Sequence, residues 1–139
     1  MSVLLDTGVL YAHHDADAEH HEAAKDTLTE VFRGEYGQPY MTDYVYDETV
    51  TLTRYRMGSF EEAKTVSDRI LDMDAIRFVH VSPEIFENSV NIFEKYHDQS
   101  LSFTDATTVA VMKKREVDAV VSLDDDFDGV VDRLDPEVI

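Results

Sequence analysis

Short runs of apolar residues alternate along this chain with longer stretches in which apolar positions recur every three or four residues. The first pattern indicates short buried strands, and the second indicates amphipathic helices. Strands are predicted at residues 3–5, 40–41, 76–81, 119–123 and 130–131, of which 40–41 and 130–131 are the weakest. Helices are predicted at about residues 17–33, 43–56, 59–73, from 83 onward, and 102–115.

Capping residues mark several of these helix starts. Capping boxes open at Ser59 and Ser102, and Ser82 stands before Pro83 at a first helical position. Strands separated by helices, with no strong hairpin signal, predict an α/β fold in which helices flank a parallel sheet on both faces. The chain has no internal repeat or linker, so residues 1–139 are expected to form one domain.

Several classes of protein are disfavoured by composition. No apolar run approaches the roughly 18 residues of a membrane span, and the first residues lack the basic segment of a secretory signal. Absence of cysteine excludes disulfides, zinc thiolate sites and cysteine nucleophiles. These features predict a cytoplasmic protein that does not act at a membrane.

The charge is strongly acidic and is spread along the whole chain. Thirty Asp and Glu residues against twelve Lys and Arg give a net charge of −18. This pattern favours a halophilic protein, because charge keeps such a surface hydrated while salt screens the self-repulsion. At about 1 M salt the Debye length is only about 3 Å. The alternative is an ordinary acidic protein, since net charge bears on solubility rather than on source.

Acidic residues stand where a parallel sheet places its functional sites, beyond the carboxyl ends of the strands. Asp6 directly follows the strand at 3–5, and Asp124 follows the strand at 119–123. Asp105 opens a helix at what we expect to be the same edge, and a helical projection places it on an inward face.

Glu48 is predicted to face inward from its helix. At about 100° per residue, Glu48 falls on the same face as Val45, Leu52 and Tyr55, whereas Asp47 falls on another side. A carboxylate on an apolar face is costly unless it is paired or bound to a cation.

Four acids at one sheet edge, with no basic partner reserved for them, predict a divalent cation as the counter-charge. Ligation by oxygen alone suits Mg²⁺ or Mn²⁺, and the chemistry usual for such a cluster is phosphodiester hydrolysis. Each acid also has a structural interpretation. Asp6 would cap the following helix, Asp105 would complete a capping box with Ser102, Glu48 would pair with a core arginine, and residues 124–126 would form a solvated loop.

Four segments together resemble the PIN-domain family. Leu4-Leu5-Asp6-Thr7-Gly8-Val9-Leu10 resembles the opening of PIN domains, and Asp43-Tyr44-Val45-Tyr46-Asp47-Glu48-Thr49 resembles the segment that carries the second acid. Leu101-Ser102-Phe103-Thr104-Asp105-Ala106 resembles the segment with the third acid, and Val121-Ser122-Leu123-Asp124-Asp125-Asp126-Phe127 the closing segment. Each motif alone is weak, but four in order are fairly specific. Gly8, where many relatives have Ser or Asn, and Ser122, in place of the commoner Thr, depart from the pattern.

The resemblance implies a Mg²⁺- or Mn²⁺-dependent endoribonuclease, often the VapC-type toxin of a pair with a VapB-type antitoxin. Its metal ligands or water-orienting residues would be Asp6, Glu48, Asp105 and Asp124, with Asp126 as a secondary acid. The side chains that would hydrogen-bond a ligand carboxylate or a metal-bound water are Thr7, Ser102 and Ser122. An antitoxin arginine would be able to take the metal's place among the carboxylates. A homodimer is suggested by the resemblance alone.

RNA contact has few candidate cations in so acidic a chain. They are Arg54 and Arg56, near the end of the helix that carries Glu48, and the run Lys113-Lys114-Arg115. Both groups have an alternative interpretation as helix ends whose cations complement the helix dipole. The pairs at residues 13–14 and 20–21 are histidines without a usual zinc spacing, and we expect them at the surface.

Three functional hypotheses remain from the sequence. The first is a toxin-type endoribonuclease, the second a housekeeping PIN nuclease in RNA processing, and the third a PIN scaffold that binds without turnover. A phosphoaspartyl hydrolase is disfavoured because no Asp-x-Asp motif begins at Asp6, and a receiver domain because no strand-following lysine is present.

Overall fold

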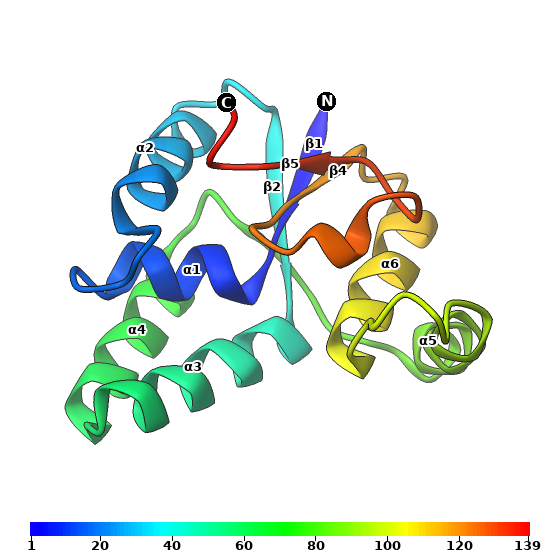
Figure 1. The fold of residues 1–139 in the computed structure, drawn as a ribbon, viewed down its shortest axis with the longest axis horizontal. Helices are drawn as coiled ribbons and strands as arrows, with labels where there is room; N and C mark the ends of the chain where they lie inside the picture. The colour runs from blue at the N-terminus through cyan, green and yellow to red at the C-terminus, as the bar shows by residue number, and fades with distance from the viewer.

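The computed structural model describes residues 1–139 and contains one five-stranded parallel sheet (Figure 1). The strand order is β3-β2-β1-β4-β5, so the first strand of the chain lies at the centre. The strands are β1 (Ser2–Leu5), β2 (Gln38–Thr42), β3 (Arg77–Val79), β4 (Ala119–Val121) and β5 (Arg133–Leu134). The helices are α1 (Thr7–His14), α2 (His21–Phe32), α3 (Asp43–Met57), α4 (Phe60–Asp72), α5 (Pro83–Lys95) and α6 (Phe103–Arg115), with a short 3-10 helix η1 at Asp125–Phe127.

Helices cover both faces of the sheet, as the sequence predicted. Alternation along β1 divides the core into two clusters, because successive strand side chains point to opposite faces. Val3 and Leu5 pack with apolar residues of α1, α2 and α4, whereas Leu4 packs with those of α5 and α6. In Figure 1, α1, α2 and α4 lie on one side of the strands and α5 and α6 on the other.

Helix α3 lies across the carboxyl end of the sheet (Figure 1). Its start is fixed by Thr42, whose hydroxyl accepts a 3.1 Å hydrogen bond from the Val45 N–H. The buried side of α3 is formed by Val45, Thr49 and Thr53. Each of these threonine hydroxyls donates to the carbonyl four residues earlier, at 2.7 and 2.8 Å, so neither is unsatisfied. Glu48 is therefore carried on a helix anchored at the carboxyl edge of the sheet.

Helix α1 was not predicted, and the start of α2 was placed too early. Thr7 and residues 9–12 are buried, so α1 presents no polar stripe that periodicity would detect. The predicted helix start at Asp17 is wrong because residues 15–20 form the turn between α1 and α2. There Asp17 donates its N–H to Asp15 Oδ1 at 3.0 Å, and α2 begins at His21.

The last strand was also predicted in the wrong place. Residues 130–131 are not a strand, because the N–H groups of Val130 and Val131 both bond to the Phe127 carbonyl in a turn. Pairing with β4 begins only afterwards, where Arg133 lies opposite Val120. The strands at 76–81 and 119–123 are shorter than predicted, and the residues that follow β4 form a loop that leads into η1 instead.

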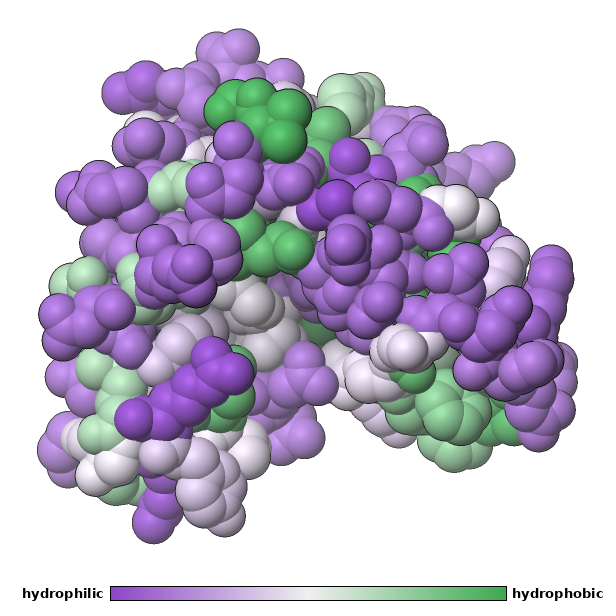
Figure 2. Space-filling model, viewed as in Figure 1, coloured by the Kyte–Doolittle hydropathy of each residue, from purple (hydrophilic) through white to green (hydrophobic).

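Hydrophilic residues cover most of the face seen in Figure 2, in keeping with the net charge. None of the helices has the length and apolar character required to span a membrane.

Phe127 anchors the loop after β4 in the core. Its side chain is fully buried in the cluster between the sheet and α6. We expect Phe127→Ala to lower the free energy of unfolding by about 3–5 kcal/mol, because it leaves a large cavity. Urea unfolding followed by circular dichroism would measure the change.

Tyr55→Ala is the control for Phe127→Ala, since that aromatic side chain is 79% exposed. Its effect should stay within about 0.5 kcal/mol. Equal stability of wild-type protein and Phe127→Ala would contradict the anchoring role.

Candidate active site

Asp6 and Ser122 meet because β1 and β4 are neighbouring parallel strands. Leu5 lies opposite Val121, so the next residue of each strand emerges at the same edge of the sheet. The Asp6 N–H bonds to the Val121 carbonyl at 3.1 Å, and the Ser122 hydroxyl donates a 2.7 Å hydrogen bond to Asp6 Oδ2. Asp6 occupies the cap position of α1 but makes no side-chain capping bond. Asp6 thus stands at the helix cap, but its carboxyl does not serve as a side-chain cap.

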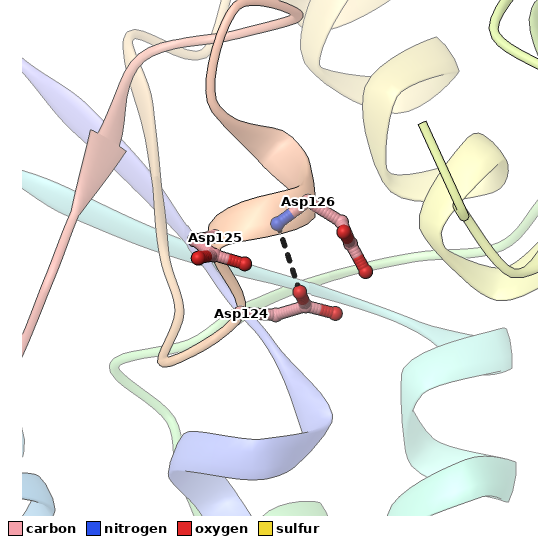
Figure 3. Close-up of side chains that lie close together, drawn as sticks. All are labelled: Asp124, Asp125 and Asp126. Carbon is pink, nitrogen blue, oxygen red and sulfur yellow. Dashed lines mark hydrogen bonds between the residues drawn. The ribbon is translucent and has the colours of Figure 1, made fainter. Parts of the chain in front are cut away.

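Ser122 also orients the following acidic loop. Its buried hydroxyl accepts a 2.9 Å hydrogen bond from the Asp124 N–H, so one side chain joins Asp6 to the backbone of Asp124. Asp124 Oδ1 then accepts from the Asp126 N–H at 2.9 Å, which caps η1. Figure 3 shows the carboxylates of Asp124 and Asp126 on one side of this loop, with Asp125 extending to the other. Carboxylate oxygens of these three residues lie within 4.8 Å of one another.

Asp105 combines the two interpretations that the sequence left open. Its Oδ2 accepts from the Ser102 N–H at 3.0 Å, and the Ser102 hydroxyl accepts from the Asp105 N–H at 3.0 Å. The capping box is thus complete. The side chain is nevertheless turned toward the sheet edge and lines the same pocket as Asp6. Capping occupies Oδ2 and leaves Oδ1 without a protein hydrogen bond, so the cap does not exclude a second role.

Glu48 lies on the pocket side of α3, and Asp47 is exposed, as predicted. The prediction that Glu48 shares a face of the helix with Leu52 and Tyr55 was partly wrong. Leu52 lines the pocket with Glu48, but Tyr55 is exposed, because the buried side of α3 is centred on Thr49 and Thr53. Glu48 is half-buried at the rim rather than inside the core, and it forms no ion pair with an arginine.

The four predicted acids line one pocket of about 440 Å³ at the carboxyl edge of the sheet. They come from four different parts of the chain: the end of β1, α3, the start of α6 and the loop after β4. Thr7, Ser102 and Arg56 also line this pocket. None of the four acids forms an ion pair within the protein. The tertiary structure therefore concentrates negative charge without neutralising it.

Burial and mutual repulsion raise the pKa values of the inner acids. Burial is the largest influence on Asp6 and raises its pKa to about 7, with further increases from Asp105 and Glu48; the Ser122 hydrogen bond opposes this. Burial likewise raises the pKa of Asp105 to about 6, assisted by the charges of Asp124 and Glu48 and opposed by bonds to Ser102. The charge of Asp124 raises the pKa of Asp126. A bound cation would relieve the cost of ionising these groups.

The residues present fit a hard divalent cation. Carboxylate oxygens are the ligands that Mg²⁺ and Mn²⁺ prefer, and these carboxylates have no cationic partner in the chain. In addition, the hydroxyl of Thr7 is buried at the pocket and has no hydrogen-bond partner in the protein. Buried hydroxyls are usually paired, so the Thr7 hydroxyl is available to a group bound in this pocket.

The candidate cations lie in different places. Arg56 lines the acidic pocket, whereas Arg54 lines a separate hollow between α3 and α4. The run at 113–115 is at the far end of α6, roughly 12–15 Å along the helix from Asp105 at 1.5 Å per residue. Lys114 forms an ion pair with Glu84 at 3.0 Å, and Lys113 borders another hollow. The structure therefore does not bring 113–115 to the acids.

One of the histidines predicted at the surface is buried. The His14 side chain is only 4% exposed, and its Nε2 lies 2.7 Å from Glu62 Oε2 on α4. Arg69, also on α4, lies 3.3 Å from His14 Nδ1. The sequence did not reveal this burial because it depends on α4 packing beside α1.

Arg133 supports the site and was missed by the sequence analysis. Its Nε and Nη2 donate to the two carboxylate oxygens of Asp128 at 2.8 and 3.0 Å, and its Nη1 donates to the Ser122 carbonyl at 3.1 Å. Nη1 also lies 3.3 Å from Asp135 Oδ2. Arg133 thus ties the acidic loop to β4 and β5. A lone arginine within an otherwise acidic stretch was the only available signal.

Comparison with known proteins finds a matching family model and relatives of similar sequence. The PIN domain family model matches residues 3–132. A VapC ribonuclease of Archaeoglobus fulgidus is 22% identical over 132 residues, which is 91% of this chain and 80% of that protein. The 23S rRNA-specific endonuclease VapC20 of Mycobacterium tuberculosis is 29% identical over 86 residues, 62% of this chain and 64% of that protein.

Solved structures share the fold. The crystal structure of M. tuberculosis VapC20, described as a sarcin-ricin loop cleaving toxin, matches with a TM-score of 0.79 and 25% identity, covering 90% of this chain and 92% of that one. A toxin–antitoxin complex from Klebsiella pneumoniae matches with a TM-score of 0.67 and 17% identity, covering 96% and 97%.

The raised pKa of Asp6 predicts how stability depends on pH in metal-free protein. The pKa of Asp6 is about 7 in the folded state, against an ordinary value of 3.8. Asp6 therefore adds to the free energy of unfolding below about pH 4, and this contribution is lost as the pH rises toward 7. We therefore expect Asp6→Asn to stabilise the protein in EDTA at pH 8, by on the order of 2–4 kcal/mol. Urea unfolding at pH values from 4 to 8 would measure this difference.

Asp47→Asn removes the same charge from an exposed position of α3. This control should not become more stable relative to wild type as the pH rises. A pH-independent difference between Asp6→Asn and wild type would contradict the assignment of a buried, repelled carboxylate.

Proposed function

Because this chain belongs to the PIN domain family, we propose that it is a divalent-metal-dependent endoribonuclease that hydrolyses RNA phosphodiester bonds. The observation that carries the proposal is the pocket in which Asp6, Glu48, Asp105 and Asp124 meet without a cationic partner. The relatives named as a ribonuclease and as an rRNA endonuclease support the choice of RNA as the substrate class.

The proposed metal ligands are the four pocket acids, with Asp126 as a further acid beside Asp124. Mg²⁺ or Mn²⁺ is the proposed ion. Ser122 would hold Asp6 through its 2.7 Å hydrogen bond, and Ser102 would hold Asp105 through the capping box. Thr7 would donate a hydrogen bond from its unpaired hydroxyl to a ligand carboxylate or to a metal-bound water. The Ser122 hydroxyl and the Ser102 N–H orient carboxylates that would otherwise rotate, which is the usual support for metal ligands.

A divalent ion in this pocket would lower the pKa of water and offset the charge that develops on the scissile phosphate. The protein's part is to hold the carboxylates oriented and close together, and the bound cation would favour their deprotonated form. They come from the end of β1, from two helices and from the loop after β4, and the Ser122 hydroxyl holds the Asp124 N–H of that loop. Glu48 and Asp124 line the pocket and are only half-buried, so the acids can be reached from solvent.

We further propose that the nuclease is a toxin held inactive by a VapB-type antitoxin. The proposal is supported by the relatives named VapC and by the toxin–antitoxin complex with the same fold. An antitoxin arginine inserted among the four carboxylates would supply the missing positive charge and compete with the metal. The neighbouring gene would distinguish a toxin from a housekeeping nuclease, because a toxin would be encoded beside a small antitoxin gene.

Cleavage of RNA should require Mn²⁺ or Mg²⁺ and the Asp105 carboxylate. We expect Asp105→Asn to reduce the rate at least about 100-fold, because it removes an anionic ligand. Asparagine keeps a side-chain oxygen that accepts the Ser102 N–H, so the helix cap and the fold should survive. Total RNA incubated at low and molar KCl, with metal or EDTA, gives the measurement.

Asp47→Asn is the matched control for the cleavage assay and should retain the wild-type rate. Full activity of Asp105→Asn would leave that residue as a helix cap and contradict the four-acid site. Absence of cleavage by folded wild-type protein under all conditions would favour a scaffold that binds without turnover.

Metal binding should also stabilise the folded protein. At a Mn²⁺ concentration of about 100 times Kd, the expected gain is about 2.7 kcal/mol. Thermal or urea unfolding at pH 8 would detect this gain in wild type and in Asp47→Asn. Asp6→Asn should lose most of it, and an equal gain in all three proteins would contradict the proposed ligands.

A further inference from the structure

Arg56 is the only lysine or arginine that lines the acidic pocket. It is exposed, and it forms no ion pair, although acidic residues outnumber basic ones by thirty to twelve in this chain. Its guanidinium carbon instead lies 5.2 Å from the centre of the Tyr11 ring. A cation at the rim of the pocket has thus remained without a carboxylate partner.

The aromatic support of Arg56 is itself firmly held. Tyr11 is buried in α1, and its hydroxyl donates a 2.5 Å hydrogen bond to Asp15 Oδ2. A cation–π contact positions a guanidinium without neutralising its charge and leaves its N–H groups free to bind an anion. Arg56 is therefore pre-positioned for a phosphate, which a guanidinium binds through two parallel hydrogen bonds.

A second pocket, of about 310 Å³, adjoins the acidic one at Arg56. The two pockets share Gly8, Arg56 and Leu123, so they form a continuous surface on either side of the arginine. The ionisable groups that line only the second pocket are Tyr11, Asp15, Glu19 and His20. Asp15 already accepts hydrogen bonds from the Tyr11 hydroxyl and the Asp17 N–H. The Glu19 carboxylate is exposed, and it would repel a phosphate but would accept a hydrogen bond from the amino group of a base.

We propose that Arg56 binds the RNA phosphate next to the cleaved bond and that the adjoining pocket receives the neighbouring base. The inference rests on the proposed nuclease function and adds to it the direction in which the RNA strand leaves the acids. Arg56 is a substrate-binding residue in this proposal and takes no part in holding the metal.

Arg54 provides a closely matched control. It lies two residues earlier in the same last turn of α3, it is exposed, and it forms no ion pair. Its guanidinium carbon lies 5.4 Å from the centre of an aromatic ring, that of Phe60. The two arginines therefore contribute similarly to net charge and helix dipole, but Arg54 borders the hollow between α3 and α4 instead of the acidic pocket.

The test compares Arg56→Gln with Arg54→Gln for binding of a fluorescently labelled single-stranded RNA. Binding is measured in the Asp105→Asn background, so that the RNA stays intact, over a series of KCl concentrations. We expect Arg56→Gln to weaken binding about 10-fold and to reduce the slope of log K against log salt by about 0.7, the value for one lost phosphate contact on a single strand. Arg54→Gln should change affinity less than about 2-fold and leave the slope unchanged.

Two further readouts separate substrate binding from a structural effect. In the cleaving background, Arg56→Gln should raise KM more than it lowers kcat, because the contact is present before the reaction as well as during it. The rise in unfolding temperature on adding Mn²⁺ should equal that of wild type, since the metal ligands are untouched.

The outcomes distinguish this inference from the function on which it rests. Metal-dependent cleavage by wild type, with equal RNA affinity and salt slope in the two arginine variants, would overturn the Arg56 subsite and leave the nuclease intact. No cleavage by folded wild-type protein would overturn the nuclease proposal itself.

Discussion

The hydrogen bond from the Ser122 hydroxyl to the Asp6 carboxylate joins the two strands on which the rest of the site depends. Both residues are buried, and both stand at the carboxyl ends of neighbouring parallel strands. The same hydroxyl accepts the Asp124 N–H, so a single side chain sets the position of two acids. Arg133 holds the Ser122 carbonyl from the other side and binds Asp128 at the end of the loop. A change in the register of β1 against β4 would therefore displace the whole acidic loop.

Concentrating carboxylates in a partly buried pocket is unfavourable by itself, and the surrounding structure carries that cost. Burial and like charges raise the pKa of Asp6 and of Asp105 above the ordinary value. Two well-packed apolar clusters support this edge of the sheet from both faces. A bound cation would lower this cost. The pocket therefore favours binding of a positive charge, either the proposed metal or the proposed antitoxin arginine. The same geometry therefore fits both the proposed metal and the proposed antitoxin arginine.

The acidity of the whole chain gives local contacts particular weight. If the protein works in molar salt, as its composition predicts, charges more than about 3 Å apart are largely screened. Net charge then matters less to an approaching RNA strand than a cation in direct contact with it. Arg56 is the cation that we propose for such a contact, because it borders the acids, whereas Lys113 and Lys114 lie at the other end of α6.

Local signals in the sequence determined the alternation of strands and helices, the caps at Ser59, Ser82 and Ser102, and the positions of the four pocket acids along the chain. These features depend on side-chain period and on residues a few positions apart, which a single sequence records directly. Helix α1 was not predicted because it is buried on most sides and has no polar stripe. The last strand was misplaced because Val130 and Val131 are an apolar pair, although they lie in a turn.

Only the tertiary structure decided which distant residues meet. The strand order places Ser122 against Asp6, the packing of α3 across the sheet edge brings Glu48 to the rim while exposing Tyr55, and the course of the last strand brings Arg133 to the Ser122 carbonyl. Arg54 and Arg56 were equivalent in the sequence, yet a two-residue step around α3 directs one to the acids and the other away. Contacts of this kind depend on strand register and on the angle at which helices pack, which no local pattern specifies.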